Sequence, residues 1–298
     1  MLPNFIGIGA PKAGTTWLAR CLAEHPQVYM APVKETSFFR YEDPDGRLAE
    51  YEAHFAGAGE AVAVGEFTTS YLEHPRPAAA IRRILPDVRL LLSLRNPIDQ
   101  VYSHYWHLAR QNFHSGSQSA SCTFEEAIER HGDKMFAAAR YHDHLQRWLT
   151  FFDRSQLLVL FYDDLRSQPD RALRETYSFL GVDANFVAPS TKETGAAVRK
   201  GVSPRSSRLG QLHNLLYDRL NRCVYRPLKN LIGVRRAARL KDLLRVRQSL
   251  EAVFFRQGYP AMRPETRALL AERFASEIGG LEELTGRDLS HWSRASES

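Results

Sequence analysis

Eight residues near the start of the chain have the types and spacing of an anion-binding loop. The segment Gly9-Ala-Pro-Lys-Ala-Gly-Thr-Thr16 follows a short apolar run, residues 5–10, and leads into a helical pattern at residues 15–23. Where a glycine-rich turn joins a strand to a helix, backbone N–H groups and the positive end of the helix dipole attract anions. The alternative is a glycine turn that only starts a helix.

The loop departs from the phosphate loop of nucleotide hydrolases at the position that serves magnesium. That pattern has lysine directly after the second glycine, followed by a Ser or Thr that binds Mg²⁺. Here Thr15 follows Gly14, and Lys12 lies inside the loop. The apolar run at residues 88–95 also ends in arginine instead of an aspartate that would help to hold magnesium. A cation without metal ligands suits a 5′-phosphosulfate, so we expect no metal site.

A second polar group follows the apolar run at residues 88–95. Arg95, Asn96 and Pro97 come at its carboxyl end, which is the edge where open α/β sheets bind ligands. Ser103 follows eight residues after Arg95, about two helical turns on, so both side chains can face one ligand. An arginine fork with a hydroxyl suits a phosphate, although a strand-end ion pair and a helix contact would also explain them. Together the two segments predict a ligand with phosphates at both ends of an adenosine.

The elements that must hold these loops alternate between strands and helices. Apolar runs predict strands, and helical periodicity predicts helices. The expected strands are 5–10, 61–66, 88–95 and 156–165, and the expected helices are 15–23, 99–110, 124–130, 141–152, 169–180 and one that begins at Pro264. Such alternation implies crossover connections and a parallel sheet. The predicted fold class is α/β: a P-loop-like parallel sheet covered by helices on both faces, with a helical C-terminal third.

Composition places the chain among ordinary globular proteins. It has 298 residues, of which 44% are hydrophobic and 25% charged, and we expect a single domain over residues 1–298. Its apolar runs are strand-sized, and neither a membrane span nor a signal peptide is predicted. Cys21, Cys122 and Cys223 are widely spaced, which argues against disulfides or a zinc site. This cysteine usage suits a reducing compartment and predicts a cytoplasmic location.

Positive charge is concentrated in residues 199–247. This segment holds fourteen Lys and Arg against two acids, a local charge of +12 in a chain of formal charge +6, so the remainder carries −6. A basic segment on an acidic chain indicates an anionic ligand, an anionic polymer or a membrane surface. The alternative is a solvated helical face with long basic side chains.

The two motifs and three longer stretches resemble one family, the sulfotransferases that use 3′-phosphoadenosine-5′-phosphosulfate (PAPS). PKAGTTWL resembles their 5′-phosphosulfate loop, and LRNPIDQVYSHY is similar to their 3′-phosphate segment. VYMAPVKETSFF resembles the stretch after the first helix in the Golgi carbohydrate sulfotransferases and their bacterial relatives. The two other similar stretches are LFYDDLRSQPDRALRETYSFLGV and LEELTGRDLSHW.

The resemblance implies that PAPS is the sulfuryl donor, that 3′-phosphoadenosine-5′-phosphate (PAP) is the product and that no metal takes part. Lys12 would assist departure of the bridging oxygen, and Trp17 would stack on the adenine. Arg95 and Ser103 would hold the 3′-phosphate. The residues expected to cradle the 5′-phosphate are Ala13, Gly14, Thr15 and Thr16, and those of a basic lid closing over the 3′-phosphate are Arg199, Lys200 and Gly201.

The family mechanism implied is in-line attack of an acceptor oxygen or nitrogen on sulfur, with a general base that takes the acceptor proton. Glu35 matches the glutamate base of the carbohydrate sulfotransferases. A surface carboxylate paired with Lys34 would be the plainer interpretation. His74, followed by Pro75, is the rival, because cytosolic sulfotransferases use a histidine about twenty residues before the Arg-Asn segment.

The expected acceptor is a hydroxyl or amine of a sugar, a lipid or a small molecule. No nucleic acid partner is expected, peripheral contact with a membrane is compatible with the sequence, and the oligomeric state is not predicted. One alternative function is a P-loop nucleoside or nucleotide kinase, which Thr15 in the lysine position disfavours. Another is a non-catalytic protein that binds an anionic polymer or lipid through residues 199–247, with steep salt dependence.

Overall fold

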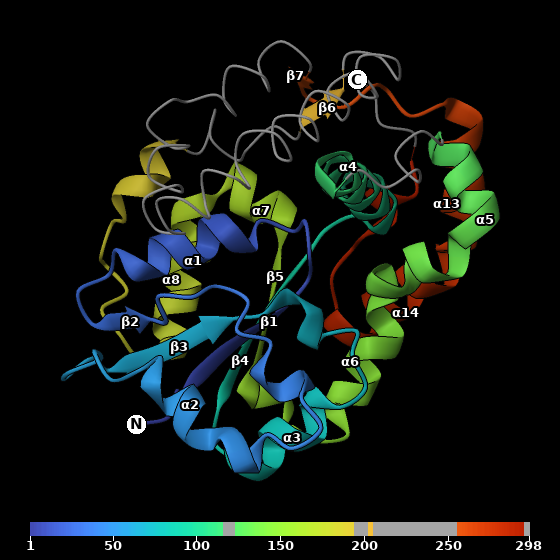
Figure 1. The fold of residues 1–298 in the computed structure, drawn as a ribbon. Helices are drawn as coiled ribbons and strands as arrows, with labels where there is room; N and C mark the ends of the chain where they lie inside the picture. The colour runs from blue at the N-terminus through green and yellow to red at the C-terminus, as the bar shows by residue number, and fades with distance from the viewer. Residues whose placement is uncertain (116–122, 194–201, 205–254, 295–298) are drawn as a thin grey trace, which may run out of the picture. The chain divides into compact units, whose positions relative to one another are not determined.

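The computed structural model describes residues 1–115, 123–193, 202–204 and 255–294, which divide into two compact units (Figure 1). The first unit comprises residues 1–101, 136–199 and 264–298, and the second comprises 102–135 and 200–263. Apart from residues 202–204, the predicted basic segment lies outside the described residues.

A five-stranded parallel sheet forms the centre of the first unit. In spatial order its strands are β2 (Val28–Met30), β3 (Ala63–Phe67), β1 (Phe5–Gly9), β4 (Arg89–Leu94) and β5 (Leu157–Phe161). Ile6 of β1 is in register with Glu66 of β3 and with Leu90 of β4. Because the chain continues from β1 to one side of the sheet and later crosses to β4 on the other, the strand order reverses between β1 and β4. Ligands of open α/β sheets bind at such a reversal, outside the carboxyl ends of the strands.

Helices cover both faces of this sheet (Figure 1). On one face, α1 (Thr15–Ala23) and α8 (Pro169–Leu180) pack on a buried cluster that includes Phe5 of β1 and Leu91 of β4. On the other face lie α3 (Pro77–Ile84) and α6 (Tyr141–Leu149). The predicted parallel sheet with helices on both faces is therefore confirmed.

The remaining elements include several that the sequence pattern did not predict. The first unit also contains α2 (Leu48–Ala53), α7 (Tyr162–Ser167), α13 (Pro264–Arg273) and α14 (Ala275–Thr285). The helix α4 (Pro97–Ser115) begins in the first unit and continues into the second. The other elements of the second unit are α5 (Phe124–Phe136), β6 (Val202–Pro204) and β7 (Phe255–Gln257). The strands β6 and β7 are antiparallel. The expected strand at 156–165 ends at Phe161 and turns into α7, because Asp163 and Asp164 in the first turn favour the positive end of a helix.

Two glycines in the sheet make room for aromatic rings. A Cβ on Gly7 of β1 would lie 2.0 Å from the ring of Phe67, and a Cβ on Gly65 of β3 would lie 2.5 Å from the ring of Phe5. Both rings are buried, with Phe67 at 1% and Phe5 at 0% exposure. Each phenylalanine is the register partner of the glycine that its ring approaches, so the two glycines leave room for these rings in the sheet.

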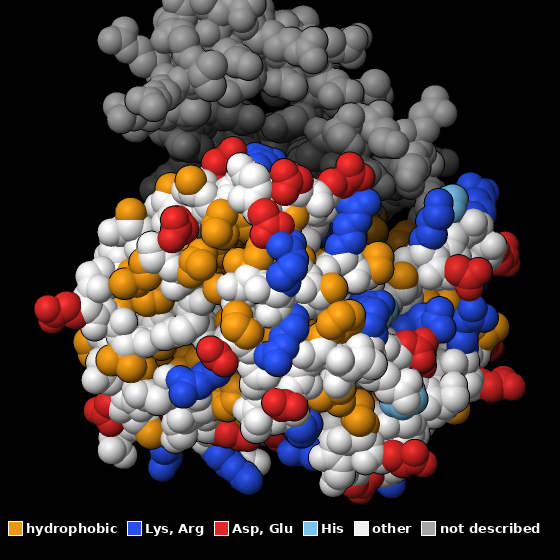
Figure 2. All heavy atoms as spheres, turned by 90° about the horizontal axis from the view of Figure 1, so that it is seen from below, with side chains coloured by type: hydrophobic (Ala, Val, Ile, Leu, Met, Phe, Trp, Pro, Cys, Tyr) orange, Lys and Arg blue, Asp and Glu red, His pale blue; other side chains and the backbone are white. Residues whose placement is uncertain are grey.

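The surface seen from below in the orientation of Figure 1 carries acidic and basic side chains intermixed (Figure 2). Near α2 and α3 they form exposed ion pairs, such as Arg76 with Glu42 at 3.1 Å and Arg47 with Glu50 at 2.6 Å. Exposed pairs of this kind contribute little to stability. None of the helices in the described part of the chain has both the length and the apolar character needed to cross a membrane.

Candidate functional site

The loop between β1 and α1 turns at Gly14, the N-cap of the helix. Gly14 has φ 85°, a left-handed conformation that glycine adopts freely. A Cβ there would also lie 3.1 Å from the ring of Tyr162, so the position is both strained and crowded for any other residue. The carbonyl of Gly14 accepts the N–H groups of Trp17 (3.0 Å) and Leu18 (3.1 Å), which closes the first turn of α1.

Three consecutive carbonyl oxygens of this loop are bound by side chains on or after β4. The pairs are Gln100 with Pro11 (3.2 Å), Arg95 with Lys12 (3.3 Å) and Ser93 with Ala13 (2.6 Å). The C=O and N–H of a trans peptide point in opposite directions, so the N–H groups of Lys12, Ala13 and Gly14 point away from β4. The first N–H groups of α1 have no intrahelical acceptor, and the N-cap residue, Gly14, has no side chain to cap them. The loop therefore presents backbone donors, as an anion site requires.

The two threonines that begin α1 differ in position. Thr15 is buried, whereas Thr16 is exposed and accepts a hydrogen bond from Nζ of Lys34 at 3.0 Å. Lys34 thus brings a second positive charge to the first turn of α1, where Lys12 was the only expected cation. The sequence placed Lys34 beside Glu35 but gave no sign that it reaches Thr16, because nothing local predicts how residues 31–37 return to the helix.

Glu35 is fixed in place by more than its ion pair. Its Oε1 lies 3.3 Å from Nζ of Lys34, which is the pairing that the plainer interpretation foresaw. Thr69 holds the same carboxylate with its backbone N–H (2.8 Å to Oε2) and its hydroxyl (3.1 Å to Oε1). The N–H of Glu35 donates to the carbonyl of Phe67 at 2.8 Å. Through Lys34, Glu35 is linked to Thr16 at the start of α1.

Arg95 follows β4, and its guanidinium lies over the ring of Tyr162, 4.8 Å from the ring centroid. It is part-buried and also holds the Lys12 carbonyl, so it stands beside the loop after β1. The neighbouring Asn96 has a structural role: its Nδ2 donates to the carbonyl of Trp292 at 2.8 Å, and its Oδ1 accepts the N–H of Ile98.

Ser103 lies in the part of α4 that belongs to the second unit. It is 3% exposed, and its hydroxyl is 3.3 Å from the hydroxyl of Tyr259. Ser103 therefore already has a hydrogen-bond partner of its own. The predicted lid residues Arg199, Lys200 and Gly201 lie outside the described residues.

Trp17 belongs to the hydrophobic core between α1 and the sheet. It is 7% exposed, and its Nε1 donates to the carbonyl of Ser190 at 3.3 Å. This arrangement leaves little of the indole ring for the adenine that the resemblance places on it. The reason is helical geometry, because Trp17 shares the sheet-facing side of α1 with Leu18 and Cys21.

His74 follows the short helix η3 (Thr69–Tyr71). Its Nδ1 accepts the backbone N–H of Arg76 at 3.3 Å. Partial burial lowers the pKa of His74, and the nearby positive charges of Arg40, Arg76 and Arg147 lower it further. Among the described residues, His74 bonds within its own segment and to Arg147, and not to Thr16 or Glu35.

Glu66, at the end of β3, is a buried acid that the sequence analysis did not single out. Its side chain is 0% exposed, and burial raises its pKa from 4.5 to about 7 although hydrogen bonds oppose this rise. Thr68 donates to its Oε2 at 2.7 Å, and Tyr51 donates to its Oε1 at 3.3 Å. The sequence feature that could have indicated it is an acidic residue inside the otherwise apolar run AVAVGEF, because a buried charge requires hydrogen-bond partners.

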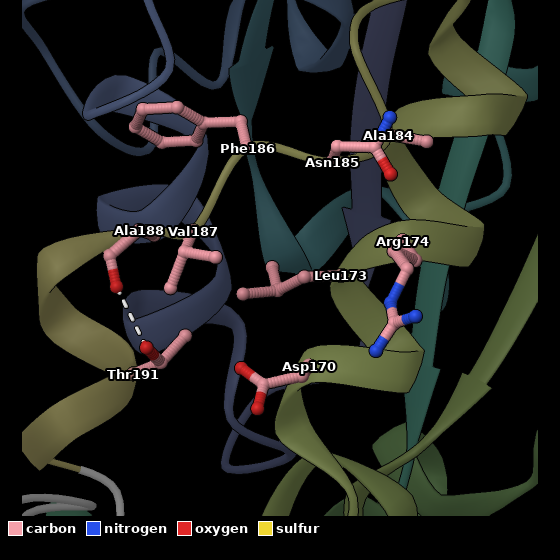
Figure 3. A pocket seen from close by; sticks show the side chains of 9 residues that line it. All are labelled: Asp170, Leu173, Arg174, Ala184, Asn185, Phe186, Val187, Ala188 and Thr191. Carbon is pink, nitrogen blue, oxygen red and sulfur yellow. Dashed lines mark hydrogen bonds between the residues drawn. The ribbon is translucent and has the colours of Figure 1, made fainter.

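A pocket of about 200 Å³ lies between α8 and residues 184–191 (Figure 3). Leu173 and Arg174 line it from α8, and on the other side Thr191 donates to the carbonyl of Ala188 at 2.7 Å. The residues lining it include none of those predicted to bind the nucleotide. In the described part of the chain, no group of three or more His, Cys, Asp or Glu is placed to hold a metal ion.

Comparison with known proteins gives a consistent result. Residues 2–202 match the model of the sulfotransferase domain family. The chain is 28% identical over 201 residues to the human bifunctional heparan sulfate N-deacetylase/N-sulfotransferase 2, covering 61% of this chain and 22% of that protein. It is 30% identical over 145 residues to the membrane-associated sulfotransferase kil1 of Dictyostelium discoideum, covering 48% and 31%. The chain thus spans less than a third of the length of these two relatives.

A solved structure shares the fold over nearly the whole chain. The crystal structure of a sulfotransferase from Alicyclobacillus acidocaldarius superposes with a TM-score of 0.69 at 24% sequence identity. The match covers 99% of this chain and 100% of the other. At this identity the likeness concerns the fold alone.

Proposed function

The chain belongs to the sulfotransferase family, and we propose that it transfers the sulfuryl group of PAPS to a hydroxyl or amine of an acceptor. One observation carries the donor assignment: the carbonyls of Pro11, Lys12 and Ala13 are all bound from the side of β4. The amide groups of Ala13, Gly14 and the first turn of α1, together with the charge of Lys12, suit a phosphosulfate. A nucleotide that also needs a metal would require acidic ligands, and β4 is followed instead by Arg95.

The loop would bind the 5′-phosphate of PAPS and stabilise its departure. During in-line transfer, negative charge develops on the phosphate oxygen that leaves sulfur. Fixed amide donors and the ammonium group of Lys12 stabilise such a charge without reorganisation. Lys34, hydrogen-bonded to Thr16 at 3.0 Å, would add a second cation at the same helix end. In this proposal Arg95 provides the guanidinium for the 3′-phosphate, and Ser103 its hydroxyl.

The acceptor side of sulfur would be served by Glu35. Its carboxylate is held by the N–H and hydroxyl of Thr69, so it has a fixed direction. A general base has to be positioned before its basicity matters, and Glu35 is the candidate whose position relative to Thr16 is set by contacts. His74 remains the alternative base.

We propose a carbohydrate as the acceptor class. The support is the name of the human relative, a heparan sulfate N-sulfotransferase, which matches over 61% of this chain. A sugar amine and a sugar hydroxyl are both compatible with base catalysis by Glu35. Incubating candidate saccharides with radiolabelled PAPS and identifying the product by mass spectrometry tests the class. Labelling of lipids or small phenols in preference to saccharides would overturn it.

Nucleotide binding without magnesium tests the donor directly. PAP should raise the melting temperature in the presence of a chelator, with a stabilisation of about 2.7 kcal/mol at a hundredfold excess over its dissociation constant. AMP, which lacks the 3′-phosphate, should stabilise the protein far less. Greater stabilisation by ATP with magnesium than by PAP would contradict the proposed function and favour a kinase.

A further inference from the structure

The buried carboxylate of Glu66 lies beneath the loop that carries Glu35. Thr68 donates to Glu66 at 2.7 Å, and the same hydroxyl accepts the backbone N–H of Ser37 at 3.2 Å. A hydroxyl has one proton, so donation to Glu66 leaves the lone pairs of Thr68 free to receive Ser37. The ionised carboxylate therefore orients Thr68 toward the loop.

The hydroxyl of Tyr71 binds a second backbone N–H group of the loop. The hydroxyl of Tyr71 accepts the backbone N–H of Phe39 at 3.2 Å and lies 3.2 Å from Oγ1 of Thr36. Oγ1 of Thr36 is in turn 3.5 Å from Oγ1 of Thr68. Two backbone N–H groups of the loop are thus bound by hydroxyls that belong to one buried cluster around Glu66.

The loop needs such support because two of its residues are in a rarely adopted conformation. Glu35 has φ 66° and Ser37 has φ 55°, both in the left-handed region that non-glycine residues seldom occupy. Conformations of this kind persist only where the surrounding structure imposes them. The hydrogen bonds that the N–H groups of Ser37 and Phe39 donate to the hydroxyls of Thr68 and Tyr71 act directly on this strained segment.

We propose that Glu66 is a positioning residue for Glu35: its ionised carboxylate orients the hydroxyls that hold the loop at residues 35–39. This inference rests on the proposed role of Glu35 as the base. A neutral carboxyl would itself need an acceptor, so one of the hydroxyls around it would have to reverse. If Thr68, the nearest of these hydroxyls at 2.7 Å, accepts the carboxyl proton, it must turn its own proton elsewhere. Its hydrogen bond with Ser37 then changes, and with it the support of the loop that carries Glu35.

The titratable groups that interact with Glu66 are two tyrosines, Tyr51 from α2 and Tyr71 from η3. Burial raises the pKa of both, and the charge of Glu66 raises it further, so they stay neutral donors. The charged groups of the loop itself, Lys34 and Glu35, pair with each other. Because burial raises the pKa of Glu66 to about 7, turnover should rise as pH increases through that value.

Replacing Glu66 by glutamine is the central experiment. Glu66→Gln should lower kcat about tenfold, leave KM for PAPS unchanged and remove the rise in kcat near pH 7. Thr68→Val should give the same loss of kcat, and Thr68→Ser, which keeps the hydroxyl, should restore it. Glu277→Gln is the matched control, because burial also raises the pKa of Glu277 but it lies on α14. A wild-type kcat and pH profile in Glu66→Gln would overturn the inference.

Hydrogen exchange provides a readout that does not depend on catalysis. The amides of Ser37 and Phe39 should exchange at least tenfold faster in Glu66→Gln than in the wild type, with unchanged exchange in the sheet. If the wild type transfers no sulfuryl group from PAPS, the proposed function fails, and exchange at these two amides still decides whether Glu66 holds the loop. If the wild type is active but the amides remain protected in Glu66→Gln, only the role of Glu66 fails.

Discussion

The loop at residues 10–14 leads into Thr16, which is hydrogen-bonded to Lys34 of the loop at residues 34–39, but side chains bind different backbone groups in the two loops. In the first loop, side chains on or after β4 bind the carbonyl oxygens of Pro11, Lys12 and Ala13. In the second loop, the N–H groups are bound by Phe67, Thr68 and Tyr71. The backbone groups that side chains bind therefore influence what each loop can offer. The first offers donors to an anion, and the second presents the Glu35 carboxylate as an acceptor.

Both loops contain left-handed residues that are not glycine. In the first loop, Gly14 takes φ 85° without strain because it has no Cβ, but Lys12 takes φ 66° with its side chain attached. In the second loop, Glu35 and Ser37 take similar angles with side chains attached. The second loop differs in that a buried titratable group, Glu66, supports it through the hydroxyl of Thr68. We expect it to be the more sensitive of the two to pH and to substitutions outside the site.

The largest expected effect is a loss of turnover, and the two loops should differ in whether affinity for PAP is lost with it. Glu35→Gln keeps the shape of the side chain but removes its basicity, so turnover should fall by about a hundredfold to ten-thousandfold. Affinity for PAP, measured by calorimetry, should change little. Lys12→Ala should impair both turnover and PAP affinity, because its charge lies in the loop that binds the 5′-phosphate.

The control for this comparison is His74→Ala. The Nδ1 of His74 already accepts the backbone N–H of Arg76, so turnover should stay within a few-fold of the wild type. Loss of turnover in His74→Ala together with near-normal turnover in Glu35→Gln would assign the base to His74 instead.

The next effect is a pH-dependent change in the free energy of unfolding, caused by Glu66 beneath the second loop. The pKa of Glu66 is about 7 in the folded protein and near 4.5 when unfolded, so the folded state binds the proton more tightly between these values. Its contribution to stability is full below pH 4.5 and is lost as the pH rises through 7. From pH 5 to pH 8 the wild type should lose about 2–3 kcal/mol of unfolding free energy that Glu66→Gln does not lose. If unfolding free energies from urea denaturation changed with pH by the same amount in both proteins, the raised pKa of Glu66 would be contradicted.

The smallest effect tests the first loop. Arg95→Ala removes a guanidinium from the proposed 3′-phosphate site and from the carbonyl of Lys12, and should weaken PAP binding by about 1.5–3 kcal/mol. Ser103→Ala removes a neutral hydroxyl that already contacts Tyr259, and should cost about 0.5–1.5 kcal/mol. The choice among acceptors should be unaffected in both variants. Equal PAP affinity of Arg95→Ala and the wild type by calorimetry would remove Arg95 from the site.

Local sequence was sufficient where neighbouring residues decide the structure. The helix predicted at residues 15–23 is α1 with the same bounds, because glycine, threonine and the following apolar residues mark its start and its buried side within a few positions. The parallel sheet and the sulfotransferase family were predicted correctly for the same reason, since continuous apolar runs and the PKAGTTWL and LRNPIDQVYSHY motifs are contiguous. The end of β5 was placed too late, since the two aspartates after Phe161 were counted with the strand instead of as a helix start.

Contacts between distant segments decided the rest. Three hydrogen bonds join residues that are distant in the sequence: Trp17 to Ser190, Lys34 to Thr16 and Tyr51 to Glu66. No local sequence pattern predicts these contacts. The sequence by itself thus determined which residues carry charge, donors and glycine flexibility in the first loop. Only the tertiary structure decided which carboxylate is buried and which backbone groups remain for a ligand. The physical reason is that burial and hydrogen-bond satisfaction depend on all the segments that surround a group, not on its neighbours in the chain.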